Sequence, residues 1–230
     1  SRAWCWRRPS SPSSPLSAVR ECVSAVRSLL DGEQVDHQGK VFAFDDVKLV
    51  YPQLDRVPLH LGVIGPKMLQ LSGEVADGSI LSVAAGVDYI RWARERIDEG
   101  RERSGREDAH RLTVFAIYAV DEDASAAKKA ARDTLAFYKA AGGRNALTDV
   151  AGISDALVEM SARGGAETVA AEMPGSWVED LTVSGTPGEV IEKMNALFDA
   201  GADSVSLFPA NGVDVPATIE LTAAEVLPEI

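Results

Sequence analysis

The feature of this 230-residue sequence that most restricts its fold is a repeated alternation of short apolar segments with longer amphipathic segments after Pro52. Four apolar segments alternate only weakly, as expected of strands that are buried on both faces of a parallel sheet. They are Leu59–Ile64, Ser79–Val83, Leu112–Val120 and Ser204–Phe208. Strands that alternate with helices predict an α/β protein, either an open doubly wound sheet or a (β/α)₈ barrel.

Helices are predicted around these strands because apolar residues recur there at helical spacing. The clearest start signal lies before Pro187, where Thr186 and Glu189 have the spacing of a capping box and Pro187 takes the first turn. The expected helices are Leu16–Leu30, Pro66–Ala76, Asp88–Arg103, Ala124–Ala141, Ser154–Ala162, Pro187–Ala200 and Ala217–Val226.

The number of strands distinguishes the two α/β folds. A complete barrel needs eight βα units in about 250 residues, whereas only four strands are evident in this chain of 230 residues. We therefore expect residues 16–230 to form four βα units, equivalent to the C-terminal half of a (β/α)₈ barrel. Residues 1–15 are rich in proline and serine, which predicts a disordered leader. The segment near 35–50 is expected to be an inserted hairpin.

The charge of the chain excludes several classes of partner. The sequence has 35 acidic and 23 basic residues, for a net charge of −12, which opposes binding to a nucleic-acid backbone or an anionic membrane surface. No segment approaches the roughly 20 apolar residues of a membrane span, and the N-terminal residues lack the apolar centre of a secretion signal. We therefore expect a soluble, cytoplasmic protein with no nucleic-acid or membrane partner.

The residues that most often bind metals are too few and too dispersed to predict a metal site. Cys5 and Cys22 are the only cysteines, so neither a disulfide framework nor a cysteine-based metal site is indicated. His37, His60 and His110 share no metal-ligand spacing, and none belongs to a nucleophile motif. We expect no metal, and the sequence leaves the catalytic residues unassigned.

Two tryptophans are candidates for stacking on a planar ligand, although packing is the favoured role for both. Trp92 shares an apolar helix face with Tyr89 and Ile97. Trp177 follows Pro174 and Gly175 in a predicted loop, where a substrate lid is the alternative to packing.

The most specific motif is the junction where the strand at Leu59 enters the helix at Pro66. Gly65 allows a ligand to approach the backbone, Pro66 suits a first helical position, and Lys67 adds a positive charge. The free amides and the dipole of such a helix attract a phosphate. The alternative is a simple strand-to-helix turn. The candidate cofactor-binding residues, which we call the Gly62–Lys67 loop, are Gly62, Val63, Ile64, Gly65, Pro66 and Lys67.

A set of motifs in a fixed order extends beyond this junction. After GPKML come Ala76-Asp77-Gly78, Tyr89-Ile90-Arg91-Trp92, the strand end Val120-Asp121-Glu122-Asp123, and the segment Gly185–Ile191. In this order the motifs resemble the luciferase-like monooxygenase superfamily. They are most similar to its branch that uses the deazaflavin coenzyme F420, which includes methylenetetrahydromethanopterin reductase. The resemblance runs from Leu16 to the end of the chain and corresponds to the C-terminal half of that family's barrel.

The resemblance implies a (β/α)₈ barrel with the cofactor across the C-terminal mouth and its phosphate on the Gly62–Lys67 loop. Members of that branch transfer a hydride between F420 and a small organic substrate. The alternative within the superfamily is an FMN-dependent monooxygenase. An alternative of another class is a catalytically incompetent half-barrel that only binds anions or associates with itself. Because strands without barrel partners expose backbone groups and apolar side chains, we expect a homo-oligomer or a self-associating chain.

Overall fold

The computed structural model describes residues 14–51 and 55–230. The chain begins there with helix α1 (Pro15–Leu30), whose N-cap Ser14 accepts a hydrogen bond from the Ser17 backbone N–H. Pro15 therefore belongs to a helix and not to a leader. The rest of the expected disordered leader, residues 1–13, lies outside the described residues.

A two-stranded antiparallel hairpin follows α1 and packs against it. Strands β1 (Val35–Gln38) and β2 (Ala43–Val47) form this hairpin. The Glu21 carboxylate of α1 accepts hydrogen bonds from three successive backbone N–H groups of the turn, at 2.9–3.0 Å. One side chain thereby joins the hairpin to the helix, because it satisfies turn amides that have no strand partner.

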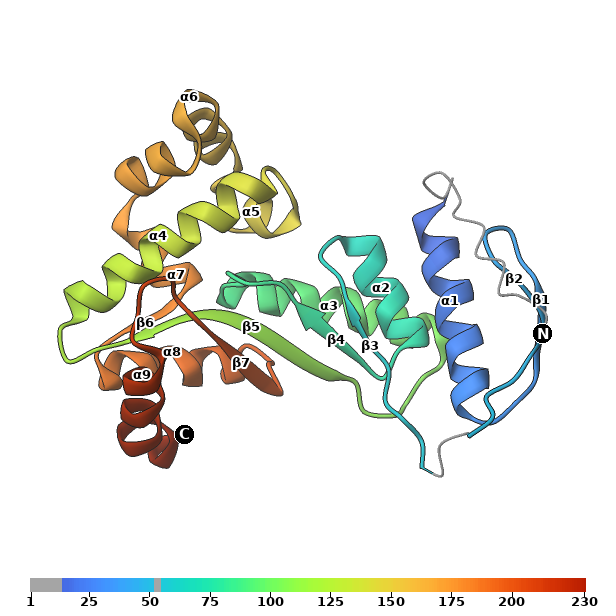
Figure 1. Ribbon diagram of the computed structural model, residues 1–230. Helices are drawn as coiled ribbons and strands as arrows, with labels where there is room; N and C mark the ends of the chain where they lie inside the picture. The colour runs from blue at the N-terminus through green and yellow to red at the C-terminus, as the bar shows by residue number, and fades with distance from the viewer. Residues whose placement is uncertain (1–13, 52–54) are drawn as a thin grey trace.

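The centre of the protein is a parallel sheet of five described strands (Figure 1). The longest strand, β5, pairs in parallel with three others, and β3 pairs with β4. The strands are β3 (His60–Gly62), β4 (Gly78–Leu81), β5 (Arg111–Val120), β6 (Val183–Gly185) and β7 (Ser204–Pro209).

Strands β4 and β6 share one edge of β5. The N–H of Arg111 donates to Asp77 beside β4, and the N–H of Asp121 donates to the β6 residue Gly185. The Leu112 carbonyl instead accepts from Asp203, just before β7. Since alternate residues of a strand direct their amides to opposite edges, β4 and β6 lie end to end on one edge and β7 lies on the other.

The observed strands confirm the α/β class and correct the strand count. All four expected strands form, with ends shifted by a few residues, but β6 is a fifth strand that the sequence did not predict. Its three residues, Val-Ser-Gly, are too short to show a strand period. Within the described residues the sheet stays open and does not close into a barrel.

The helices agree closely with the sequence pattern, except between Gly143 and Thr182. There α5 and α7 were not expected, and α6 is longer than predicted because two helical segments join at Gly164 and Gly165, which have non-helical backbone angles. The helices are α2 (Pro66–Val75), α3 (Val87–Ser104), α4 (Ala124–Gly142), α5 (Ala146–Val150), α6 (Ser154–Glu172), α7 (Gly175–Leu181), α8 (Pro187–Asp199) and α9 (Val215–Leu221). A π-helical turn, Thr222–Val226, and a 3₁₀ turn, Leu227–Glu229, follow α9.

Side chains from the two faces of β5 form two hydrophobic cores. Leu112, Val114 and Tyr118 pack with residues of α3 and α8. Ile117 and Ala119, which point to the other face, pack with residues of α4, α6 and α7. The alternation follows from the two-residue period of a strand and places the α4–α7 layer over the C-terminal half of β5 (Figure 1).

Helices α2 and α3 approach closely through two glycines. A Cβ atom added to Gly73 would lie 2.1 Å from the carbonyl oxygen of Ile97, and one added to Gly100 would lie 1.9 Å from that of Gln70. Only glycine allows this backbone separation, so these two positions fix how α2 and the loop before it sit on the sheet. No described helix combines the length and apolar character needed to cross a membrane.

Candidate functional site

The C-terminal ends of parallel strands lie at one end of the sheet, and the Gly62–Lys67 loop lies there. Two contacts hold this loop. The N–H of Val63 donates to the carbonyl of Ile80 in β4 at 3.3 Å. The hydroxyl of Tyr89, in the first turn of α3, donates to the carbonyl of Ile64 at 2.6 Å. The loops after β3 and β4 are thus joined directly.

The backbone of the loop is open at its two glycines. A Cβ atom added to Gly62 or to Gly65 would meet no other atom within 4 Å. Gly65 is the N-cap of α2 and has no side chain to cap the first amides. A helix start of this kind presents N–H groups and the positive end of its dipole to open space, which suits an anion such as phosphate.

The six predicted loop residues do not all face the same way. Gly62 is exposed, and Val63 and Ile64 are half-buried and pack against the main core. The Lys67 side chain lines a groove between α1 and α2 together with Arg20 and others, on the outer side of α2. The open part of the loop is therefore formed by glycine backbone, and the Lys67 side chain contributes to a different surface.

Tyr89 is a positioning residue that the sequence reasoning assigned only to packing. Its side chain is 2% exposed, and its ring centroid lies 5.5 Å from that of Trp92. Burial raises the pKa of the Tyr89 hydroxyl, so the group stays protonated and remains a hydrogen-bond donor to Ile64. The signal in the sequence was a phenol on the apolar face at the start of a helix, where a buried hydroxyl needs a partner.

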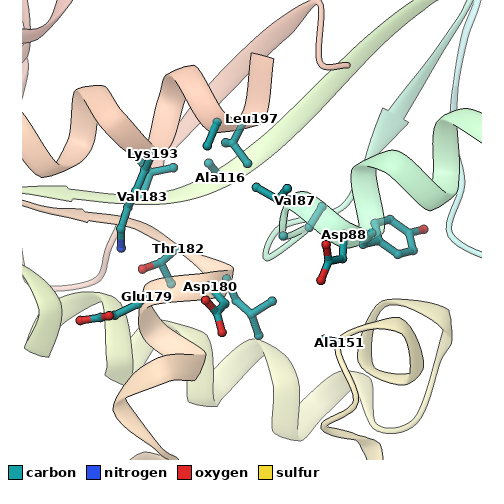
Figure 2. Close-up of a pocket in the computed structure, with 15 residues that line it drawn as sticks. Val87, Asp88, Ala116, Ala151, Glu179, Asp180, Thr182, Val183, Lys193 and Leu197 are labelled. Carbon is teal, nitrogen blue, oxygen red and sulfur yellow. The ribbon is translucent and has the colours of Figure 1, made fainter. Parts of the chain in front are cut away.

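A pocket of about 250 Å³ opens beside Tyr89 (Figure 2). Its walls come from the start of α3, the end of α7, the start of β6 and one face of α8. Lys193 of α8 lines it, and no sequence motif pointed to this lysine. Trp177 lies in α7, is 8% exposed and belongs to the second core, so its packing role is confirmed.

The histidines do not form a metal site. Among residues 14–51 and 55–230, no three His, Cys, Asp or Glu side chains are placed to hold an ion. His110 instead ends a buried chain of hydrogen bonds. Its Nε2 lies 3.0 Å from Ser79 Oγ, which lies 2.7 Å from Ser72 Oγ. Both serines are fully buried at the N-terminal end of the strands, so this serine–histidine pair is structural.

Asp77, within the Ala76-Asp77-Gly78 motif, also has a structural role. Its carboxylate accepts hydrogen bonds from the backbone N–H of Leu59 and from the guanidinium groups of Arg27, Arg56 and Arg106. Burial opposes ionisation of Asp77, but these hydrogen bonds outweigh it and hold the pKa below its usual value. Asp77 thereby joins α1 to the starts of β3 and β4.

Comparison with known proteins shows what this arrangement is similar to. The family model described as luciferase-like monooxygenase matches residues 8–204. The chain is 32% identical over 224 residues to 5,10-methylenetetrahydromethanopterin reductase of Archaeoglobus fulgidus, a match that covers 94% of this chain and 67% of the reductase. The chain therefore spans about two thirds of the length of this relative.

Two solved structures share the fold. The coenzyme F420-dependent tetrahydromethanopterin reductase of Methanopyrus kandleri has a TM-score of 0.79 and 24% identity, with 94% of this chain and 63% of that one covered. An F420-dependent secondary alcohol dehydrogenase bound to an F420–acetone adduct has a TM-score of 0.70 and 22% identity, with coverage of 96% and 65%.

Proposed function

Because this chain belongs to the luciferase-like monooxygenase family, we propose that it acts as an oxidoreductase that transfers a hydride between coenzyme F420 and a small organic substrate. The names of two similar solved proteins support this proposal, since both are described as F420-dependent. The fold supports it as well, because the loops at the carboxyl ends of parallel strands are where α/β enzymes bind their ligands.

The Gly62–Lys67 loop is the proposed site for the cofactor phosphate. The observation that carries this assignment is the open backbone at Gly62 and Gly65, where an added Cβ would meet nothing within 4 Å. A phosphate oxygen takes the space that a side chain would fill and accepts hydrogen bonds from the first amides of α2. The bound deazaflavin supplies the redox chemistry, and the residues of this chain bind and orient it.

Tyr89 contacts the Gly62–Lys67 loop from the interior of the protein. Its hydroxyl donates to the Ile64 carbonyl, so this oxygen points into the protein and not toward the anion. A carbonyl oxygen facing a phosphate would repel it, whereas N–H groups attract it. Tyr89 therefore keeps the donor groups of the loop on the ligand side.

Titration of the 230-residue protein with F420, followed by the absorbance of the deazaflavin, tests the proposal. We expect F420 to bind more tightly than FMN and inorganic phosphate to compete with it. Tighter binding of FMN would replace this proposal by the FMN-dependent monooxygenase. Binding of phosphate with no binding of either cofactor would support the incompetent half-barrel.

We also propose that the chain associates with itself through exposed apolar side chains of its sheet. Phe115 of β5 and Phe208 of β7 are 38% and 37% exposed. Thr113 and Ser204 hydrogen-bond beside them at 2.9 Å. An exposed apolar sheet face favours association. Light scattering tests this, and a monodisperse monomer at high concentration contradicts it.

A further inference from the structure

A groove of about 280 Å³ lies on the outer side of α2, where α1, α2 and the end of α3 meet. Its floor is one face of α2, because Lys67, Leu71 and Glu74 recur there at helical spacing. Helix α1 contributes Leu16 and Arg20, which are one turn apart. Side chains of three helices therefore build the groove.

Helices α1 and α2 run in the same direction along the groove, and Figure 1 shows them side by side. Arg20 of α1 pairs with Glu74 of α2. Arg27, two turns later in α1, pairs with Asp77 just after α2. The first turns of both helices therefore lie at the same end of the groove, which is the end with Lys67. Each helix start carries the positive end of a helix dipole, so it adds to the positive charge of Lys67.

The other end of the groove carries two arginines that share one acid. The Glu74 carboxylate binds the guanidinium groups of Arg20 and Arg103, the latter at 2.8 Å. The side chains of these arginines are 51% and 57% exposed, whereas that of Glu74 is 10% exposed. One carboxylate balances only one of the two guanidinium charges, so this end keeps a net positive charge that a ligand can reach. The close contact of α2 and α3 through Gly73 and Gly100 lies beside these residues and fixes the distance between the two helices.

The groove is positively charged at both ends and apolar between them. Three cations and one carboxylate line it, although the whole chain has a net charge of −12. Lys67 and Glu74 are seven residues apart on α2, so the two ends are separated by about 10 Å along the helix axis. Leu16 and Leu71 contribute apolar surface. An anionic group is attracted to either end, and a ligand that reaches both ends also crosses the apolar surface.

We propose that this groove binds a linear organic dianion, a molecule with an anionic group at each end of a short apolar chain. Lys67 binds one anionic group, and the guanidinium groups of Arg20 and Arg103 bind the other. The chain between them contacts Leu16 and Leu71. A monoanion uses only one end of the groove, so it binds more weakly. The site lies outside the proposed cofactor loop and does not depend on cofactor binding there.

Titration of the 230-residue protein with matched carboxylates tests the proposal. Octanedioate carries two carboxylates on a chain that spans the groove, octanoate carries one, and butanedioate carries two on a chain too short to reach both ends. The NMR signals of the Arg20 and Arg103 Nε–H groups and of the Lys67 ε-methylene group report binding at each end. We expect octanedioate to bind about fivefold more tightly than the other two, the gain from one further exposed ion pair. An affinity for octanedioate no higher than that for octanoate or for butanedioate overturns the proposal.

Two variants locate the binding, one at each end of the groove. Lys67→Met removes the charge at the α2 start, so the preference for octanedioate over octanoate is expected to disappear. Arg20→Met leaves Glu74 paired with Arg103 alone, so the second end becomes neutral and the same loss is expected. Lys129→Met removes a lysine charge from an exposed position in α4 and is expected to change nothing. Unchanged octanedioate affinity in either Lys67→Met or Arg20→Met overturns the assignment.

Measurements on the unmodified protein cover the case in which a variant loses its fold. The signals of Lys67 and of the two arginines are expected to move with octanedioate at the same midpoint, and signals that stay fixed at either end overturn the proposal. Because the cations are exposed, salt screens them, so the preference for octanedioate over octanoate is expected to disappear at about 1 M sodium chloride. A preference that persists at this salt concentration shows that ion pairs do not hold the ligand, which also overturns the proposal.

Discussion

The hydroxyl of Tyr89 donates a hydrogen bond to the carbonyl oxygen of Ile64 at 2.6 Å. One residue belongs to the loop after β3 and the other to the helix after β4, so this bond joins two βα units at the proposed cofactor end. Tyr89→Phe removes only the hydroxyl. We expect F420 affinity to fall about fivefold and stability to fall by about 1 kcal/mol, the usual contribution of one hydrogen bond. Titration with F420 and urea unfolding measure the two effects. Equal F420 affinity in the unmodified protein and in Tyr89→Phe would show that Tyr89 does not position the loop for cofactor binding.

Gly65→Val tests the open backbone of the Gly62–Lys67 loop. Gly65 has extended backbone angles, φ −81° and ψ 157°, which valine adopts readily, and an added Cβ atom meets no other atom within 4 Å. The variant is therefore expected to fold normally but to bind F420 at least about tenfold more weakly, because the side chain occupies the anion position. Lys67→Ala is expected to have a smaller effect, since that side chain lies between α1 and α2. A larger loss from Lys67→Ala would show that the lysine reaches the ligand.

Gly100→Ala tests the close approach of α2 and α3. Its Cβ atom would lie 1.9 Å from the Gln70 carbonyl oxygen, a backbone atom that cannot rotate away. We expect a loss of about 3 kcal/mol or more in the free energy of unfolding, the upper range for overpacking. The control is Gly188→Ala in α8, where nothing lies within 4 Å. That change is expected to be neutral or stabilising. Equal unfolding midpoints for the two variants would contradict this account of the packing.

Asp77→Asn tests the carboxylate that joins α1 to the sheet. The change leaves the partly buried guanidinium group of Arg27 without its anion, so we expect the free energy of unfolding to fall by about 3 kcal/mol. Asp133→Asn, on the exposed side of α4, is the matched control. Because the pKa of folded Asp77 lies below its usual 3.8, this stabilisation is fully present above pH 3.8 and is lost as the pH falls through the lowered value. Urea unfolding at pH 7 measures the difference.

His110 makes the free energy of unfolding depend on pH, at higher pH values than Asp77 does. Burial and the nearby Arg101, Arg94 and Arg106 lower its pKa from 6.5 to about 4. Between these values the unfolded chain binds a proton that the folded chain does not, so stability is expected to fall as the pH drops from 6.5 toward 4. Urea unfolding at pH 7 and pH 5 measures the fall. His110→Gln keeps a partner for Ser79 but does not titrate, so it should reduce the difference between the two pH values. An unchanged difference would assign the pH dependence to other groups.

The sequence by itself determined the local elements of this protein. Periodicity placed the four expected strands of the parallel sheet and most helices within a few residues, and the predicted capping box of Thr186 and Glu189 is present in the structure. These features depend on residues close together in the chain, where side-chain period and capping chemistry decide the conformation. The ordered motifs likewise indicated the family to which the chain belongs.

The tertiary structure decided what depends on residues far apart in the chain. Strand β6 has only three residues and forms because the end of β5 offers it unpaired backbone groups. The direction of the Lys67 side chain follows from the packing of α1 against α2. The bond from Tyr89 to Ile64 depends in the same way on elements that pack together only in the folded chain. Long-range packing selects which edge, groove or carbonyl a residue meets, and no local period in the sequence encodes that choice.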